Sequence, residues 1–216
     1  MKNDPPEISG SKKGEKQMGK CLLCCVLAIS ALVIVPSVVK AEPADKVNSD
    51  ACLKEAGFYS GWGTADVGDD GAPKDYDNVY IAGRFGFNLK KWLKWDNLKG
   101  ALLFMTEPFV NPVVDPSGDY EAGLSLGLKY MFPAGDRFYP YIEGGTGGIY
   151  ISEKTRRQGS HANFVDHAGA GLYYFIKDNI ALNAGYRFRH ISNLGIKRPN
   201  GGIETHSVIA GVSLFY

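Results

Sequence analysis

The most constraining feature of this sequence is a strict alternation of residue types between residues 119 and 132. Apolar side chains occupy every second position from Tyr120 to Phe132, and from residue 121 to 129 the positions between them hold Glu121, Lys129, glycine and serine. A period of two is typical of a β-strand with one face in apolar surroundings. Seven further segments show the pattern with varying quality, separated by turn residues at fairly even spacing. The predicted strands cover residues 55–63, 78–89, 98–109, 119–132, 137–152, 163–176, 180–192 and 203–216.

Eight strands form the smallest common membrane barrel. A soluble barrel of the lipocalin kind also alternates, but it turns its apolar side inward. Three features favour the membrane version. The second face is rich in glycine and serine, which suits a narrow packed interior; the chain ends on Tyr216 after an alternating run; and the N-terminus resembles a signal peptide. We therefore predict an all-β fold, an eight-stranded antiparallel up-and-down transmembrane β-barrel.

The N-terminus predicts a processed segment. A lysine-rich stretch precedes an apolar run at residues 21–39, and Ala41 offers a small residue for signal peptidase. We expect residues 1–41 to be a cleaved signal peptide, residues 42–54 a polar periplasmic leader, and residues 55–216 the barrel. An uncleaved anchor helix is the alternative, although Pro36 interrupts it. After cleavage Cys52 is alone, so no internal disulfide or cysteine metal site is expected.

Charge and connection lengths restrict the function and suggest an orientation. The net charge of +1 does not indicate nucleic-acid binding, and the mean hydropathy of −0.16 argues against a helical membrane protein. Short links at 133–136 and 177–179 are expected on the periplasmic side. The longer links at 64–77, 110–118, 153–162 and 193–202 are then expected outside. A periplasmic link at 90–97 carries Trp92 and Trp95, either an interfacial aromatic girdle or an ordinary surface loop.

Three residues near the C-terminus have the types of a Ser–His–acid hydrolase. His190, Ser192 and Glu204 continue the apolar rows of the last two strands, so we expect them on the lipid-facing side at the outer rim. Neighbouring strands would bring Glu204 beside His190, where a carboxylate orients the ring and balances the imidazolium. Arg187 and Arg189 have inward parity and are expected to pair with acids such as Glu121. The three other histidines, His161, His167 and His206, are interpreted as structural.

The stretch from His190 to Glu204, H-I-S-N-L-G-I-K-R-P-N-G-G-I-E, resembles the signature of the outer-membrane lipid A 3-O-deacylases of the PagL type. The resemblance covers roughly the last third of the chain. It implies an eight-stranded barrel whose Ser–His–Glu triad faces lipid and removes the ester-linked acyl chain at position 3 of lipid A. It also implies oxyanion donors at Gly195 and Asn200. Asn193 matches the family pattern and, with Lys197 and Arg198, is a candidate substrate contact.

Two other functions stay open at this point. An outer-membrane phospholipase would also carry a His-x-Ser pair, usually with calcium, and a small structural or adhesive barrel would carry these residues by coincidence. The lipid A deacylase hypothesis implies no metal or other cofactor. Its partners are lipid A and outer-membrane lipids, with the barrel-assembly machinery during insertion, and no nucleic acid; a homodimer stays open.

Overall fold

The structure, a computed structural model, describes residues 47, 49–68, 75–95, 97–152, 155 and 157–216. The chain divides into two units, Met1–Val39 and Lys40–Tyr216. The predicted signal peptide at 1–41, and residues 42–46 and 48 of the predicted leader at 42–54, lie outside the described residues. All of the strands belong to the second unit.

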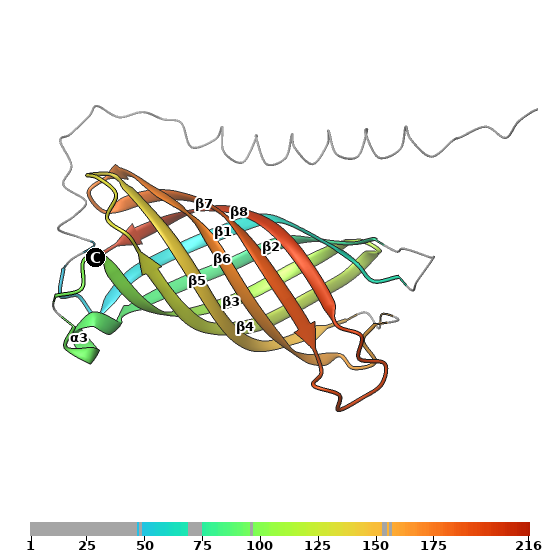
Figure 1. Ribbon diagram of the computed structural model, residues 1–216. Coiled ribbons are helices and arrows are strands. Elements are labelled where there is room, and N and C mark those ends of the chain that lie inside the picture. The colour runs from blue at the N-terminus through green and yellow to red at the C-terminus, as the bar shows by residue number, and fades with distance from the viewer. Residues whose placement is uncertain (1–46, 48, 69–74, 96, 153–154, 156) are drawn as a thin grey trace, which may run out of the picture. The chain divides into compact units, whose positions relative to one another are not determined.

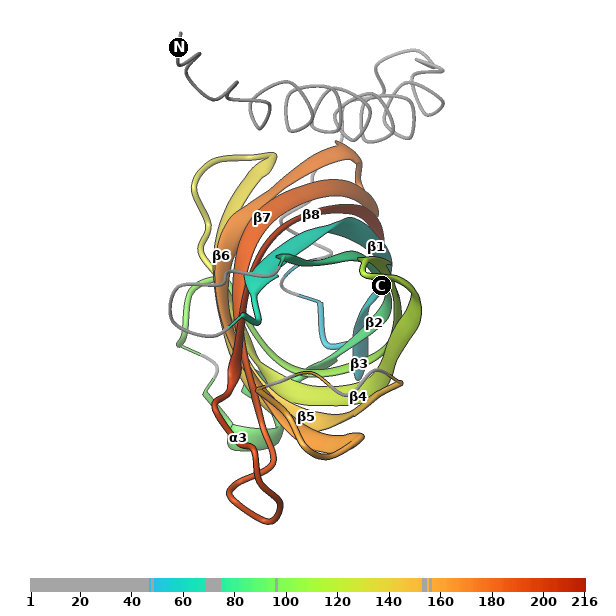
Figure 2. The same cartoon turned by 90° about the vertical axis from the view of Figure 1, so that its right-hand side faces the viewer.

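Eight antiparallel strands close into a barrel in sequence order, with β8 pairing back onto β1 (Figure 1). Figure 2 shows the strands arranged as a ring, with β1 beside β8. The fold class predicted from the alternation is therefore confirmed. The strands are β1 (Leu53–Asp66), β2 (Asp75–Asn88), β3 (Ala101–Asp115), β4 (Ser117–Met131), β5 (Phe138–Ile151), β6 (Ala162–Lys177), β7 (Ile180–Ser192) and β8 (Ile203–Phe215), with one short helix, α3 (Leu89–Leu93), between β2 and β3.

One predicted outer loop is wrong. Residues 110–118 were expected to be a long polar link, but β3 continues to Asp115 and β4 begins at Ser117. The misleading residue is Pro112, because proline lacks the N–H that a strand ladder uses. In the structure Pro112 pairs with Tyr120 of β4 and faces outward, while the neighbouring Asn111 is buried. The Asn111 side chain accepts a hydrogen bond from the Ile81 N–H at 3.1 Å.

Buried charges fill the middle of the barrel. Glu107 accepts hydrogen bonds from the Arg84 Nε at 2.6 Å and from Arg187 and Tyr80. Glu143 lies 3.2 Å from the Arg84 Nη1 and also contacts Arg187. Both guanidinium groups are almost fully buried, which is tolerated only because each one is paired. This network separates two apolar clusters, one toward each end of the barrel.

The prediction that the strand arginines face inward is confirmed. Arg189 forms an ion pair with Glu121, its Nη1 lying 2.9 Å from the Glu121 Oε2, and both side chains are buried. Arg187 is paired with Glu107 and Glu143. The alternate positions of β7, including His190 and Ser192, must then point outward.

The outside of the barrel is apolar. Large hydrophobic side chains that are between 39 and 68% exposed occur on strands all around the ring. A surface of this size and kind belongs in hydrocarbon rather than water, and closure leaves no unpaired strand edge in the bilayer. Within the described residues, no helix is both long and apolar enough to cross a membrane. The exposed residues include Phe58, Leu124, Leu128, Ile142, Phe164, Leu172 and Val208.

The two ends of the barrel differ. The connection between β7 and β8, residues 193–202, projects from the end opposite α3 and the C-terminus (Figure 1). At the other end, Trp92 and Trp95 in and after α3 are 82 and 54% exposed. Exposed tryptophans at the rim of a membrane barrel are typical of an interfacial girdle. The orientation expected from loop lengths therefore assigns the 193–202 connection to the outer side.

Candidate active site

His190 and Glu204 face each other across the last hairpin. They are register partners on β7 and β8, and the His190 Nδ1 lies 3.8 Å from the Glu204 Oε1. Their side chains are 41 and 66% exposed, so both point away from the interior. The distance is that of an ion pair and is longer than a hydrogen bond. The predicted juxtaposition of these two residues is thus present in the structure.

Ser192 is the last residue of β7 and lies on the same outward face as His190. Two residues along a strand correspond to about 6.6 Å between Cα atoms, within reach of a rotated imidazole and hydroxyl. None of the hydrogen bonds among the described residues joins the Ser192 Oγ to His190. In ligand-free enzymes such catalytic hydrogen bonds are often long and shorten only in the substrate complex.

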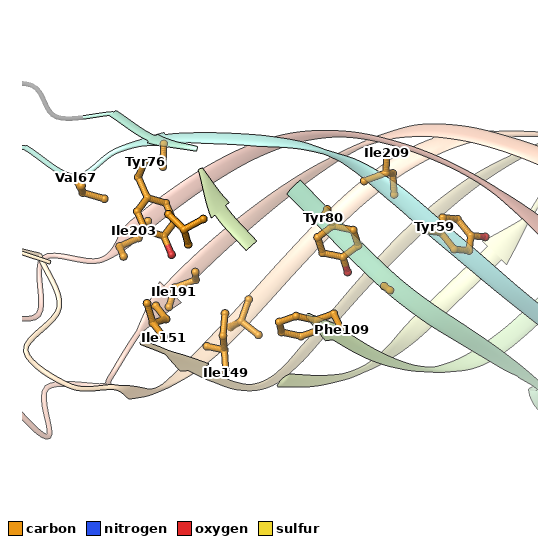
Figure 3. Packing of buried hydrophobic residues seen from close by; sticks show 14 residues of the cluster. Tyr59, Val67, Tyr76, Tyr80, Phe109, Ile149, Ile151, Ile191, Ile203 and Ile209 are labelled. Carbon is orange, nitrogen blue, oxygen red and sulfur yellow. The ribbon is translucent and has the colours of Figure 1, made fainter. Parts of the chain in front are cut away.

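The inward neighbours of this face anchor the strand ends. Ile191 and Ile203 are register partners, fully buried, and belong to the apolar cluster at this end of the barrel. Figure 3 shows them with Ile151 and Tyr76 beneath the rim. Because the interior is filled by these side chains, the site can be reached only from the outside of the barrel.

Asp166 on β6 is a residue that the sequence reasoning missed. It is the register partner of His190 on the side opposite Glu204, and it is exposed. His190 therefore lies between two outward-facing carboxylates, although only Glu204 comes within ion-pair distance among the described residues. The parity of residues 163–176 could have placed Asp166 on the outer face, but its position opposite His190 depends on the β6–β7 register.

His206 lies beside the site, although it was interpreted as structural. It pairs with Phe188 two register steps from His190 and Glu204, on the same outward face. Its Nδ1 is 2.5 Å from the Tyr186 hydroxyl, and its ring centroid is 5.3 Å from that of Phe188. These three side chains form the surface on the bilayer side of the His190–Glu204 pair.

The 193–202 connection carries the remaining candidate residues. Gly195 has φ +78° and is exposed, and none of the hydrogen bonds among the described residues uses its N–H. Asn200 is exposed, and its Oδ1 accepts the Asn193 N–H at 2.9 Å. Lys197 and Arg198 are both exposed on the same connection.

Asn193 does not lie where a substrate contact was expected. Its side chain is 1% exposed and lies inside the connection instead of on its surface. The Asn193 Nδ2 donates to the Lys197 carbonyl oxygen at 2.7 Å and to the Gln158 Oε1 at 3.3 Å. An amide can satisfy several backbone groups at once, so Asn193 organises the turn.

Among the described residues, no group of three or more His, Cys, Asp or Glu side chains is arranged to hold a metal ion. At the rim, Ser192, His190 and Glu204 offer a hydroxyl, an imidazole and a carboxylate. The fold and this cluster define a small transmembrane β-barrel of the outer-membrane type with hydrolase-like residues on its lipid-facing side.

Comparison with known proteins agrees with this class. A family model described as lipid A 3-O-deacylase (PagL) matches residues 79–213, which is more than half of the chain. The chain belongs to this family. Two curated relatives are lipid A deacylases named PagL: the Pseudomonas aeruginosa protein is 38% identical over 98 residues, and the Bordetella bronchiseptica protein is 40% identical over 73 residues. These alignments cover 42 and 32% of this chain, and 54 and 38% of the relatives.

Solved structures give the same fold. The crystal structure of the outer membrane enzyme PagL is 26% identical, with a TM-score of 0.54, covering 73% of this chain and 97% of that chain. Neisserial surface protein A is 15% identical with a TM-score of 0.53, covering 75% of this chain and 96% of that chain. The second likeness concerns the barrel fold alone.

Proposed function

We propose that this protein is a lipid A 3-O-deacylase of the bacterial outer membrane, a serine esterase that hydrolyses the ester-linked acyl chain at position 3 of lipid A. The observation that carries the proposal is the His190–Glu204 pair, 3.8 Å apart, with Ser192 on the same lipid-facing side. An ionised carboxylate is costly in hydrocarbon, so its position at the rim favours a polar task at the headgroup boundary.

The proposed reaction proceeds through an acyl-enzyme. His190 takes the proton of the Ser192 hydroxyl as its oxygen attacks the ester carbonyl carbon. The tetrahedral intermediate collapses, the ester C–O bond breaks, and His190 returns the proton to the departing glucosamine hydroxyl. A water molecule, deprotonated by His190, then attacks the acyl-serine. The acyl C–Oγ bond breaks, His190 returns the proton to the Ser192 oxygen, and the fatty acid is released. Every proton passes through the same ring.

Two donors would stabilise the negative oxygen of the intermediate. The Gly195 N–H is not used by the described hydrogen bonds of the connection, and Asn200 is exposed on the same connection. Loss of one oxyanion donor typically lowers kcat by about 10²–10³-fold. The roles of Gly195 and Asn200 follow from the family resemblance, and the free amide of Gly195 supports them.

Glu204 is proposed as the acid of the triad. Its carboxylate would accept the Nδ1–H of His190 and stabilise the imidazolium that forms during attack. Asp166 is the second candidate, because it flanks His190 from β6. The 3.8 Å distance between the His190 Nδ1 and the Glu204 Oε1 favours Glu204.

Contacts with the sugar phosphates of lipid A are proposed for Lys197 and Arg198. Both are exposed on the same connection, and cationic side chains form strong charge-assisted hydrogen bonds with phosphate. Asn193 would affect substrate binding only through the shape of the turn, because its side chain is buried. The further proposals are cleavage after Ala41, outer-membrane insertion by the barrel-assembly machinery, and lipid A as the principal partner.

The test is hydrolysis by the purified barrel. The protein refolded in detergent is incubated with hexa-acylated lipid A, and the products are analysed by mass spectrometry. We expect the loss of one hydroxyacyl group from position 3, together with the free hydroxy fatty acid, at the same rate with EDTA or calcium. Calcium-dependent release of fatty acid from phospholipid would instead identify a phospholipase, and no release from either lipid would identify a structural barrel.

A further inference from the structure

Gln158 connects two outer loops through a buried side chain. It lies in the β5–β6 connection and is 1% exposed, although both neighbouring strands end at the rim. Its Oε1 accepts the Asn193 Nδ2 at 3.3 Å. Its Nε2 donates to the Ile191 carbonyl oxygen at 3.1 Å and to the Asn200 Oδ1 at 3.3 Å. A buried amide that bonds both the end of β7 and the connection that follows it fixes the geometry of that connection.

The backbone of the same two loops is paired around Asn200. Gln158 and Asn200 form an isolated antiparallel β-bridge. The Gly159 N–H donates to the Pro199 carbonyl oxygen at 2.8 Å, and the Gly201 N–H donates to the Arg157 carbonyl oxygen at 2.8 Å. The main chain is therefore held on both sides of Asn200.

These contacts determine which end of the Asn200 amide faces outward. The Oδ1 accepts two hydrogen bonds, from the Asn193 N–H at 2.9 Å and from the Gln158 Nε2 at 3.3 Å. Two donors on one atom identify it as the oxygen. The Nδ2, the donor end, is used by none of the hydrogen bonds among the described residues, and Asn200 is exposed. The amide is thus held with its N–H groups available to a ligand.

We propose that Gln158 is a positioning residue for the reaction: it holds the Asn200 amide with Nδ2 directed at the oxyanion. The inference rests on the proposed function, in which Asn200 is an oxyanion donor. A donor that is fixed before the reaction stabilises developing charge without reorganisation. An unheld asparagine could rotate and present its Oδ1, which would repel the oxyanion.

The test is a double-mutant cycle on lipid A deacylation by the refolded barrel. Asn200→Ala should lower kcat by about 10²-fold, as for the loss of an oxyanion donor. Gln158→Ala should lower kcat by roughly 10-fold with KM nearly unchanged, a smaller loss because the Asn193 N–H still contacts the Oδ1. In the Asn200→Ala background, Gln158→Ala should lower kcat by less than about 2-fold, because the effects of substitutions at residues that act through one another are not additive.

Gln158→Glu is a more specific test. The variant keeps a side-chain oxygen that accepts from Asn193, but it replaces the Nε2 that donates to the Asn200 Oδ1 by a second oxygen. The amide of Asn200 should turn its Nδ2 inward, and kcat should fall toward the Asn200→Ala level. Asn163→Ala is the matched control: Asn163 is buried and donates to the Ser160 and His161 carbonyl oxygens of the same connection, without contacting Asn200. Its kcat should stay close to wild type.

Folding of each variant is checked by its heat-modifiable mobility on gels. If Gln158→Ala lowers kcat by the same factor with and without Asn200, the positioning role is wrong and Gln158 only supports the loop. If Asn200→Ala itself leaves kcat unchanged, the positioning role is also wrong. Ser192→Ala in the same assay separates these outcomes, because retained activity there would remove the proposed function itself.

Discussion

The backbone of Gly202 lies against the ring of His190. A β-carbon at Gly202 would come within 2.8 Å of the His190 Cε1, closer than such atoms approach one another. Gly202 also has φ +76°, a left-handed conformation that favours glycine. The connection just before β8 therefore leaves room for the imidazole only because residue 202 has no side chain.

The first prediction concerns this contact. Gly202→Ala should displace the His190 ring and lower kcat for deacylation by at least about 10-fold, because small misplacements of catalytic groups are costly. Gly135→Ala is the control, since Gly135 has φ +119° but nothing within 4 Å of an added β-carbon. Equal activity of the two variants would show that the contact does not position the ring.

The second prediction separates the two carboxylates beside His190. Glu204→Gln should lower kcat by at least about 10³-fold, as expected for loss of a triad acid. Asp166→Asn should retain activity within a few-fold, because Asp166 is a register partner of His190 without a recorded ion pair among the described residues. The reverse order of effects, measured on folded barrels, would transfer the acid role to Asp166.

The third prediction concerns the stability of the barrel. Glu107→Gln would leave Arg84 and Arg187 short of a buried partner. Breaking a buried ion pair costs on the order of 3 kcal/mol, so the urea midpoint for unfolding from lipid vesicles should fall. Glu204→Gln is the control and should leave the midpoint unchanged, because its side chain is 66% exposed. An unchanged midpoint for Glu107→Gln would mean that the network contributes little to stability.

The fourth prediction tests the proposed phosphate contacts. Replacing Lys197 and Arg198 together by alanine should raise KM several-fold for bis-phosphorylated lipid A while leaving kcat nearly unchanged. The difference should shrink at high ionic strength, because exposed charges are screened. With a dephosphorylated substrate the variant and the wild type should behave alike. An equal rise in KM for both substrates would rule out phosphate recognition by this pair.

The fold was predictable because strand periodicity is a local property. The strict alternation around Leu124 and Leu128 predicted which side chains of β4 face outward. The same rule predicted the outward-facing side chains of β7 and β8. The end of β3 was not predictable, because Pro112 reads as a loop residue in sequence. Only the pairing of β3 with β4 shows that it fits an outward-facing position of the ladder.

The candidate site was predictable where it depends on one hairpin. His190 and Glu204 are partners across neighbouring strands, so parity and chain order were sufficient. Asp166 and Gln158 were missed for a different reason. Asp166 depends on the register with β6, and Gln158 on a loop-to-loop contact over 42 residues of sequence. No short-range pattern carries either of these relationships.

The most direct measurement is the mass spectrum of lipid A from cells of a heterologous Gram-negative host expressing either the wild type or Ser192→Ala at equal levels in the outer membrane. The account predicts that lipid A from the wild-type strain loses one 3-hydroxyacyl mass and that lipid A from the Ser192→Ala strain keeps it. The same mass loss in both strains would contradict the account, because the reaction would then not require the Ser192 hydroxyl.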